Sequence, residues 1–154
     1  TREYGITKIY VTAPNLTEIR SSTGLPTRSD GVLTYPNITL LSEDYSGEFH
    51  TVGVFNMHIE NSALNVILNN LSSLTIEGNT DNLNIQFASG DARFEGRNFI
   101  AQNVVVEHRG TNDIIVNPQQ SLTANLVSTG NIISVTTPPN IDITEQYTGR
   151  VIFE

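Results

Sequence analysis

The stretches PNLTEIRSSTG (14–24), PNITLLSEDYSG (36–47) and PNIDITEQYTG (139–149) are three copies of one short pattern. Each copy begins with a Pro-Asn pair, continues with an apolar residue followed by Thr or Asp, and closes on glycine. Weaker versions of the same unit are NLNIQFASG (82–90), NVVVEHRG (103–110) and SLTANLVSTG (121–130). Such recurrence indicates a solenoid, in which each copy forms one coil and neighbouring coils bury each other's apolar side chains.

The glycines that close the units mark one corner of each predicted coil. They recur about every 20 residues, a period typical of solenoids, at Gly5, Gly24, Gly47, Gly90, Gly110, Gly130 and Gly149. Glycine adopts positive φ freely, and Asn tolerates the same left-handed conformation. Proline beside the opposite turn leaves no ladder hydrogen bond unmade. We therefore predict about seven coils, each built as strand, glycine turn, strand and Asn/Pro turn.

Apolar and polar residues alternate between the turns, as in LTIEG (74–78), LNIQF (83–87) and NVVVEH (103–108). Period two is typical of half-buried strands, and no segment holds the apolar spacing of a helix. The predicted fold is therefore all-β, a single-stranded parallel β-helix forming one domain over residues 1–154. The residues predicted to face inward are Ile9, Val11, Leu16, Ile19, Leu40, Ile59, Val66, Leu74, Ile76, Leu83, Ile85, Phe94, Val104, Val106, Ile114, Val116, Leu122, Ile133, Val135, Ile141, Ile143 and Phe153.

Two parts of the chain depart from this pattern. The segment from Met57 to Asn82 contains MHIEN, LNVIL and LTIEG, more strands than one ordinary coil holds, so we expect irregular coils there. The stack also starts abruptly at TREYG, which predicts an uncapped first coil that lacks strands of the full domain. We expect that coil to pair with a missing segment or with a second copy of the chain.

Composition excludes several classes of partner and chemistry. Eight basic residues against sixteen acidic ones give a formal net charge of −8, which disfavours nucleic acids and anionic membrane surfaces. The chain has no cysteine, so it carries neither disulfides nor thiolate sites. No run of roughly 18 apolar residues predicts a transmembrane segment.

Glu77 and Glu95 are the best candidates for catalysis. LTIEG and ARFEG place them at the same point of two short strands, out of phase with the inward residues, so both are predicted to face solvent. On neighbouring strands their carboxyl groups would lie about 5 Å apart, the separation that retaining glycosidases use. The simpler interpretation is a pair of solvated surface glutamates, which Arg93 could neutralise. We predict no catalytic residue, with this pair as the weak alternative.

Other candidate sites have little sequence support. His50, His58 and His108 show no metal-binding spacing, and the oxygen-rich turns GNTDN (78–82) and SGD (89–91) lack the acids of known calcium loops, so no metal or other cofactor is predicted. Tyr4, Tyr45 and Tyr147 each precede a turn glycine and are the candidates for binding, because aligned rings could stack on sugars. Packing of ring on ring explains the same pattern equally well.

The succession LTEIRSSTG, LNIQFASGDARFEG, VVVEHRGTNDIIV and LTANLVSTGNIISVTTPPNIDITEQYTGRVIF resembles the auto-transporter adhesin, head GIN domain family of Bacteroidetes-type secreted proteins. The resemblance covers nearly the whole chain and is strongest from Leu83 to Phe153. The usual Ser-Gly-Ser-Gly turns of that family are thinned here to SSTG, YSG, ASG, HRG, STG and YTG. The resemblance implies a β-helix-like fold, an extracytoplasmic location at the cell envelope and an adhesive role.

The leading functional hypothesis is therefore a non-enzymatic, adhesin-like binding or structural module that contacts a protein or glycan at the cell surface. Solenoids offer extended surfaces, and this one shows no convergent catalytic constellation. One alternative is a pectinase-like enzyme that cleaves polysaccharides with Glu77 and Glu95. A second alternative is a lipid-binding scaffold, which needs an apolar cavity that such regular alternation does not predict.

Overall fold

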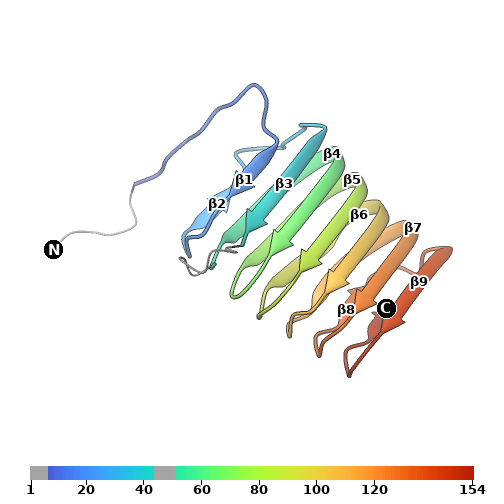
Figure 1. Ribbon diagram of the computed structural model, residues 1–154. Helices are drawn as coiled ribbons and strands as arrows, with labels where there is room; N and C mark the ends of the chain where they lie inside the picture. The colour runs from blue at the N-terminus through green and yellow to red at the C-terminus, as the bar shows by residue number, and fades with distance from the viewer. Residues whose placement is uncertain (1–6, 44–50) are drawn as a thin grey trace.

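A computed structural model describes residues 7–43 and 51–154, which form a parallel β-solenoid without any helix (Figure 1). Four long strands, coloured from green to orange, make up its middle: β4 (Val54–Leu68), β5 (Ser73–Phe87), β6 (Arg93–His108) and β7 (Ile114–Leu126). The short strands are β1 (Glu18–Arg20), β2 (Pro26–Arg28), β3 (Asn37–Ser42), β8 (Ile132–Ser134), β9 (Asn140–Glu145) and β10 (Val151–Phe153). No helix of the described residues is long and apolar enough to cross a membrane.

Each long strand turns a corner within itself, so its two halves belong to different sheets. In β4, residues 54–56 pair with β2, whereas residues 63–68 pair with β3. We call the layer of β2, the first halves of β4 to β7, β8 and β10 the first sheet. The layer of β1, β3, the second halves of β4 to β7 and β9 is the second sheet.

Every pairing between strands is parallel, as a coil that always winds in one direction requires. Val54 pairs with Ser73, 19 residues later, and Ser73 pairs with Arg93, 20 residues later. The solenoid has about seven turns of roughly 19 residues each. The fold class predicted from the repeat is therefore confirmed.

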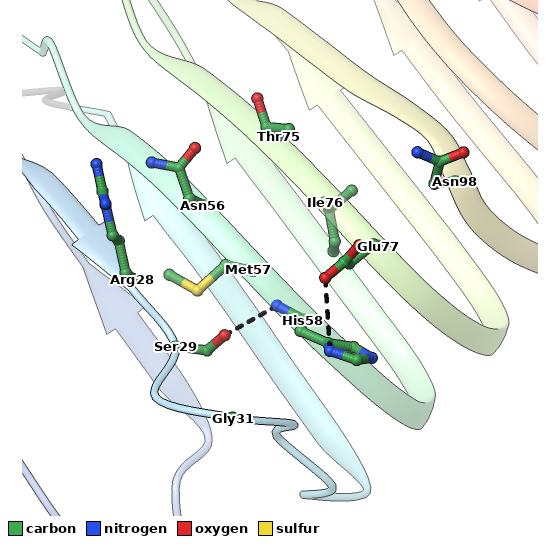
Figure 2. A pocket seen from close by; sticks show the side chains of 10 residues that line it. All are labelled: Arg28, Ser29, Gly31, Asn56, Met57, His58, Thr75, Ile76, Glu77 and Asn98. Carbon is green, nitrogen blue, oxygen red and sulfur yellow. Dashed lines mark hydrogen bonds and ion pairs between the residues drawn. The ribbon is translucent and has the colours of Figure 1, made fainter.

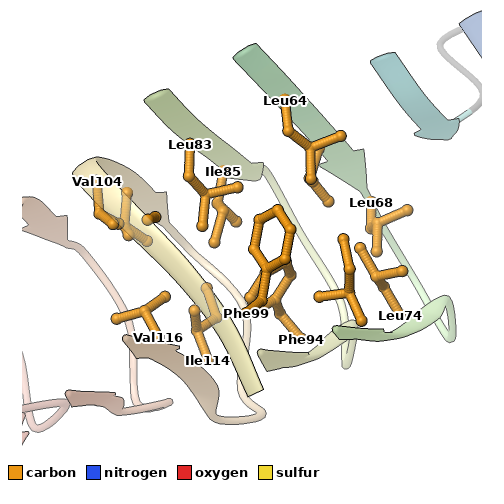
Figure 3. Packing of buried hydrophobic residues seen from close by; sticks show 14 of the residues in the cluster. Leu64, Leu68, Leu74, Leu83, Ile85, Phe94, Phe99, Val104, Ile114 and Val116 are labelled. Atoms are coloured by element: carbon orange, nitrogen blue, oxygen red, sulfur yellow. The ribbon is translucent and has the colours of Figure 1, made fainter. Parts of the chain in front are cut away.

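The core lies between the two sheets and is built from columns of stacked apolar side chains (Figure 3). On the second sheet, Leu64, Leu83 and Val104 occupy successive coils in register, and each is at most 2% exposed. Burying one such side chain stabilises the fold by roughly 1.5–3 kcal/mol, so the columns hold the coils together. The inward prediction is confirmed for Leu40, Ile59, Val66, Leu74, Ile76, Leu83, Ile85, Phe94, Val104, Val106, Ile114, Val116 and Leu122, all of which are buried.

The glycine corner is real, and it is a stack of close backbone contacts. A Cβ on Gly130 would lie 2.3 Å from the carbonyl oxygen of Asn112, and one on Gly149 would lie 2.3 Å from that of Gly130. Real Cβ atoms never approach backbone this closely, so glycine is required where coils touch at this corner. Gly5 and Gly47, predicted to close two further coils, lie outside the described residues.

The expectation of irregular coils between Met57 and Asn82 is wrong. The three strand-like stretches there lie on successive halves of β4 and β5, with an unbroken 19-residue register. The pattern looked irregular because Asn70 stands at the corner where other coils have glycine. Asn70 has a φ of 54° and bridges directly to Gly90, so it adopts the left-handed conformation that asparagine tolerates. The longer spacing lies earlier, where Asn37 pairs with Ala63, 26 residues later.

The inward prediction also fails near both ends of the described stack. Ile9 and Val11 are 85% and 83% exposed and belong to no strand, because no neighbouring layer covers them. Figure 1 shows this segment running away from the coils. The opening TREYG, where an uncapped coil is predicted, lies outside the described residues.

In β8 the register is shifted by one residue from the prediction. Ile132 and Ser134 are buried, so Ile133 and Val135 face outward and are half-buried. Apolar residues at successive positions (NIISV) leave the alternation ambiguous, and pairing with β7 decides it. Ile141 is 44% exposed because it stacks on Leu122 on one side and no described strand covers its other side. Partly buried are Leu16, Ile19, Ile143 and Phe153.

Candidate functional site

A shallow groove crosses the outer surface of the first sheet (Figure 2). It runs over β2, β4, β5 and β6 and has a volume of about 380 Å³. Its lining is mostly polar and comprises Arg28, Ser29, Gly31, Asn56, Met57, His58, Thr75, Ile76, Glu77 and Asn98. Apart from the buried Met57 and Ile76, these residues present polar side chains or backbone to solvent.

The floor of the groove consists of two rows of side chains. Arg28, Asn56 and Thr75 are register partners on successive strands and form the first row. His58, Glu77 and Asn98 form the second row. Because alternate residues of a strand point to the same face and neighbouring strands lie about 4.8 Å apart, both rows present closely spaced polar groups outward.

The chain that follows β2 forms one wall of the groove. It leaves the sheet after Arg28 and rejoins it at Leu33, which bridges to Ile59. The Ser29 hydroxyl accepts a hydrogen bond of 2.9 Å from the backbone N–H of His58. Gly31 has a φ of 86°, which glycine adopts without strain. This loop is therefore attached to the strand beneath it at two points.

A bulge in β6 forms the opposite wall. Thr75 pairs with Glu95 but Glu77 pairs with Asn98, so β6 contains one more residue than β5 across this step. A Cβ on Gly96 would lie 2.3 Å from the Phe94 ring, so glycine is needed for the chain to fold over that buried ring. Bulges re-aim side chains and are frequent beside functional sites. This one turns Asn98 toward the groove.

Charge is distributed unevenly along the groove. The Nδ1 atom of His58 lies 3.6 Å from a carboxylate oxygen of Glu77, and its Nε2 atom lies 3.9 Å from one of Glu60. Arg28 forms no ion pair with any other residue that the structure describes. The groove thus has a cationic end at β2 and carboxylates over β4 and β5, and these charges balance in part.

The asparagines of the groove differ from those of the second sheet. On the second sheet Asn103 donates to the Oδ1 of Asn82 over 3.3 Å and accepts from the Ser121 hydroxyl over 2.9 Å. The side chains of Asn56, Thr75 and Asn98 make no hydrogen bond with any residue in the described ranges. Their donors and acceptors are therefore available to a ligand.

The candidate carboxylates face outward as predicted but are not opposite each other. Glu95 is the register partner of Thr75 and lies 3.8 Å from the guanidinium of Arg93, whereas Glu77 lies between His58 and Asn98. The bulge in β6 moves the two glutamates out of line. Sequence alone signals this bulge only as a break in alternation within FEGRNF (94–99).

Tyr147, one of the three tyrosines predicted to form a binding row, is 75% exposed with a φ of 77° at the last glycine corner. Tyr4 and Tyr45 lie outside the described residues. No row of rings is therefore traced by residues 7–43 and 51–154. Arg28, Asn56 and Asn98, by contrast, carried no sequence signal, because their proximity depends on the winding of three different coils.

The three histidines have separate surroundings. His108 is buried in the core, where its Nδ1 accepts from the Gly110 N–H over 3.3 Å and its Nε2 lies 2.8 Å from the Asn112 carbonyl oxygen. Burial lowers the pKa of His108, because charging the ring there would cost solvation. His58 belongs to the groove, and His50 lies outside the described residues. Within the described part of the chain, no three His, Asp or Glu side chains are grouped so as to hold a metal ion.

Comparison with known proteins finds one family. The model of the family described as "Putative auto-transporter adhesin, head GIN domain" matches residues 1–138. No curated protein and no solved structure gives a significant match. The match covers every strand that lines the groove.

Proposed function

Since this chain belongs to the auto-transporter adhesin, head GIN domain family, we propose that it is an adhesin-like binding module that works outside the cytoplasm. The family match over residues 1–138 is the observation that carries this proposal. The architecture supports it, because a solenoid of about seven turns offers two long, regular outer surfaces. Its partner is a protein or a glycan at a cell surface.

The location is tested in cells that make the protein. Extracellular protease should digest the epitope-tagged full-length protein on intact cells while a cytoplasmic marker stays intact. Digestion only after lysis would contradict an external location.

Binding is tested with residues 1–154 presented as tetramers, because avidity reveals weak single contacts. Tetramers applied to panels of glycans and matrix proteins should bind at least one component in a saturable way. The same protein unfolded by heat is the control. A blank across both panels would leave only a structural role.

Cleavage of polysaccharides by Glu77 and Glu95 has less support, because the β6 bulge separates the two carboxylates in register. Enzymatic release of reducing ends or unsaturated sugars, lost in Glu95→Gln, would revive it. The lipid-binding alternative also has less support. Buried side chains fill the space between the sheets, and the groove is lined mostly by polar groups.

A further inference from the structure

We propose that the groove on the first sheet is the ligand site of this module and that it binds an uncharged saccharide. This inference rests on the proposed binding function and adds to it a location and a class of ligand. It follows from three properties of the groove: free amides, balanced charge and a rigid frame.

Free amides are the first property. Asn56 and Asn98 stand on β4 and β6, at the two sides of Thr75, and none of these three side chains bonds to another described residue. A side-chain amide donates through nitrogen and accepts through oxygen, and a hydroxyl does both. Sugar hydroxyl groups likewise donate and accept, so pairs of them match this row.

Balanced charge is the second property. A polyanion would be attracted by Arg28 but repelled by Glu60 and Glu77, and by the net charge of −8 of the whole chain. A polycation would meet the opposite conflict at Arg28. A ligand without net charge meets neither, while the carboxylates, His58 and Arg28 remain available for hydrogen bonds to its hydroxyls.

A rigid frame is the third property. The rows stand on paired strands, and Ser29 bonds to the backbone beneath, so little entropy is lost when a ligand binds. Strands β2 to β6 contribute four successive positions, which span about 14 Å at 4.8 Å per strand. The groove is shallow and lacks an aromatic side chain, so single sites are expected to bind weakly, with Kd on the order of 1 mM.

The test uses ¹⁵N-labelled protein of residues 1–154 and titrates neutral and acidic oligosaccharides, with Kd measured from amide chemical shifts. Neutral oligosaccharides should shift amides of β4, β5 and β6 around the groove. Affinity should change less than about twofold between low and high salt, because no net charge is neutralised.

The double variant Asn56→Ala/Asn98→Ala should weaken binding by roughly tenfold or more, since two ligand hydrogen bonds are lost. Its spectrum and melting temperature should stay unchanged, because neither side chain bonds within the described structure. The matched control is Asn37→Ala. Asn37 is an exposed asparagine of the second sheet whose side chain likewise bonds to no described residue.

Three results would overturn the groove site and leave the binding function intact: neutral saccharides that bind the double variant normally, binding of acidic saccharides alone, or binding of protein ligands alone on the panels. Equal loss in Asn37→Ala would also overturn it. No binding to any saccharide or protein would overturn both proposals.

Discussion

The two sheets of this solenoid share one backbone design but use asparagine in different ways. On the second sheet, asparagines stack in register and their amides bond from coil to coil, as Asn103 does with Asn82. In the groove of the first sheet, Asn56 and Asn98 stand beside Thr75 and bond to no described neighbour. The role of an asparagine in a coil thus depends on what the next coil places beside it.

Charge separates the same two surfaces. From β3 to β7 the outward residues of the second sheet include a single charged group, Glu107, among amides, hydroxyls and small apolar side chains. The first sheet carries ionisable groups on every strand from β2 to β6. We infer that the second sheet mainly holds the stack together, whereas the first sheet is the surface available for recognition.

The largest expected effect is loss of the support that both sheets share. Phe94→Ala should lower the free energy of unfolding by about 3–5 kcal/mol, because this ring is fully buried between the sheets and under Gly96. Urea denaturation measures the change. The adjacent outward change Glu95→Gln should stay within about 0.5 kcal/mol. Similar losses in both variants would contradict the register of β6.

The corner that joins the two sheets is expected to contribute less. Asn70→Ala should cost about 1–2 kcal/mol, because alanine is strained at the left-handed φ of 54°. Asn70→Gly also loses the hydrogen bond to Thr51 but not the favourable backbone conformation, so it should be the more stable of the two variants. The opposite order in thermal denaturation would rule out the glycine-like role of Asn70.

The contrast between ladder and groove can be tested within one strand, β6. Asn103→Ala should cost about 1 kcal/mol, since it removes bonds to Asn82 and Ser121, and it should leave ligand binding unchanged. Asn98→Ala should change stability by less than about 0.5 kcal/mol but weaken binding. Equal stability losses in denaturation curves would remove the distinction between the two surfaces.

Acidification should weaken the core on the second-sheet side through His108. Its folded pKa lies below the unfolded value of about 6.5, so the unfolded chain takes up the proton first as the pH falls. Stability is therefore fully present above that pH and is lost progressively below it, until the folded pKa is passed. His108→Gln should flatten this part of the pH dependence in denaturation curves. An unchanged pH dependence would assign the effect to other groups.

The smallest expected effect concerns the ion pair between Arg97 and Glu154 on the first sheet, which joins the bulge of β6 to the end of β10. The Arg97 guanidinium lowers the pKa of Glu154 by hydrogen bonding and charge. Arg97→Gln should raise that pKa toward its ordinary value in an NMR titration. Because both groups are exposed, thermal stability should not change measurably. A marked loss would mean that this pair closes the sheet.

The general fold could be predicted because its signals are local. Glycines at a constant interval and alternation of apolar residues both follow from the geometry of one coil, and the strands from Leu64 to Leu126 follow them. The prediction failed at Ile9 and Val11, where alternation is present but no neighbouring coil covers the side chains. It failed at Ile133 because consecutive apolar residues leave the inward face undefined.

The candidate site could hardly be predicted at all. The carboxylates Glu77 and Glu95 looked aligned because their local sequences match, and a single extra residue in β6 displaced them. The groove residues Arg28, Asn56 and Asn98 come from coils whose register depends on loops of different length. No pattern within one repeat reports such a distance.

The sequence by itself determined that this chain winds into stacked parallel strands with a glycine corner, because burial and backbone conformation are settled within each 19- or 20-residue unit. Only the tertiary structure decided which side chains meet across coils. Lateral register is set by hydrogen bonds between strands, and one bulge or one long loop shifts every contact beyond it. The same asparagine side chain therefore bonds to the next coil in one sheet and stays available for a ligand in the other.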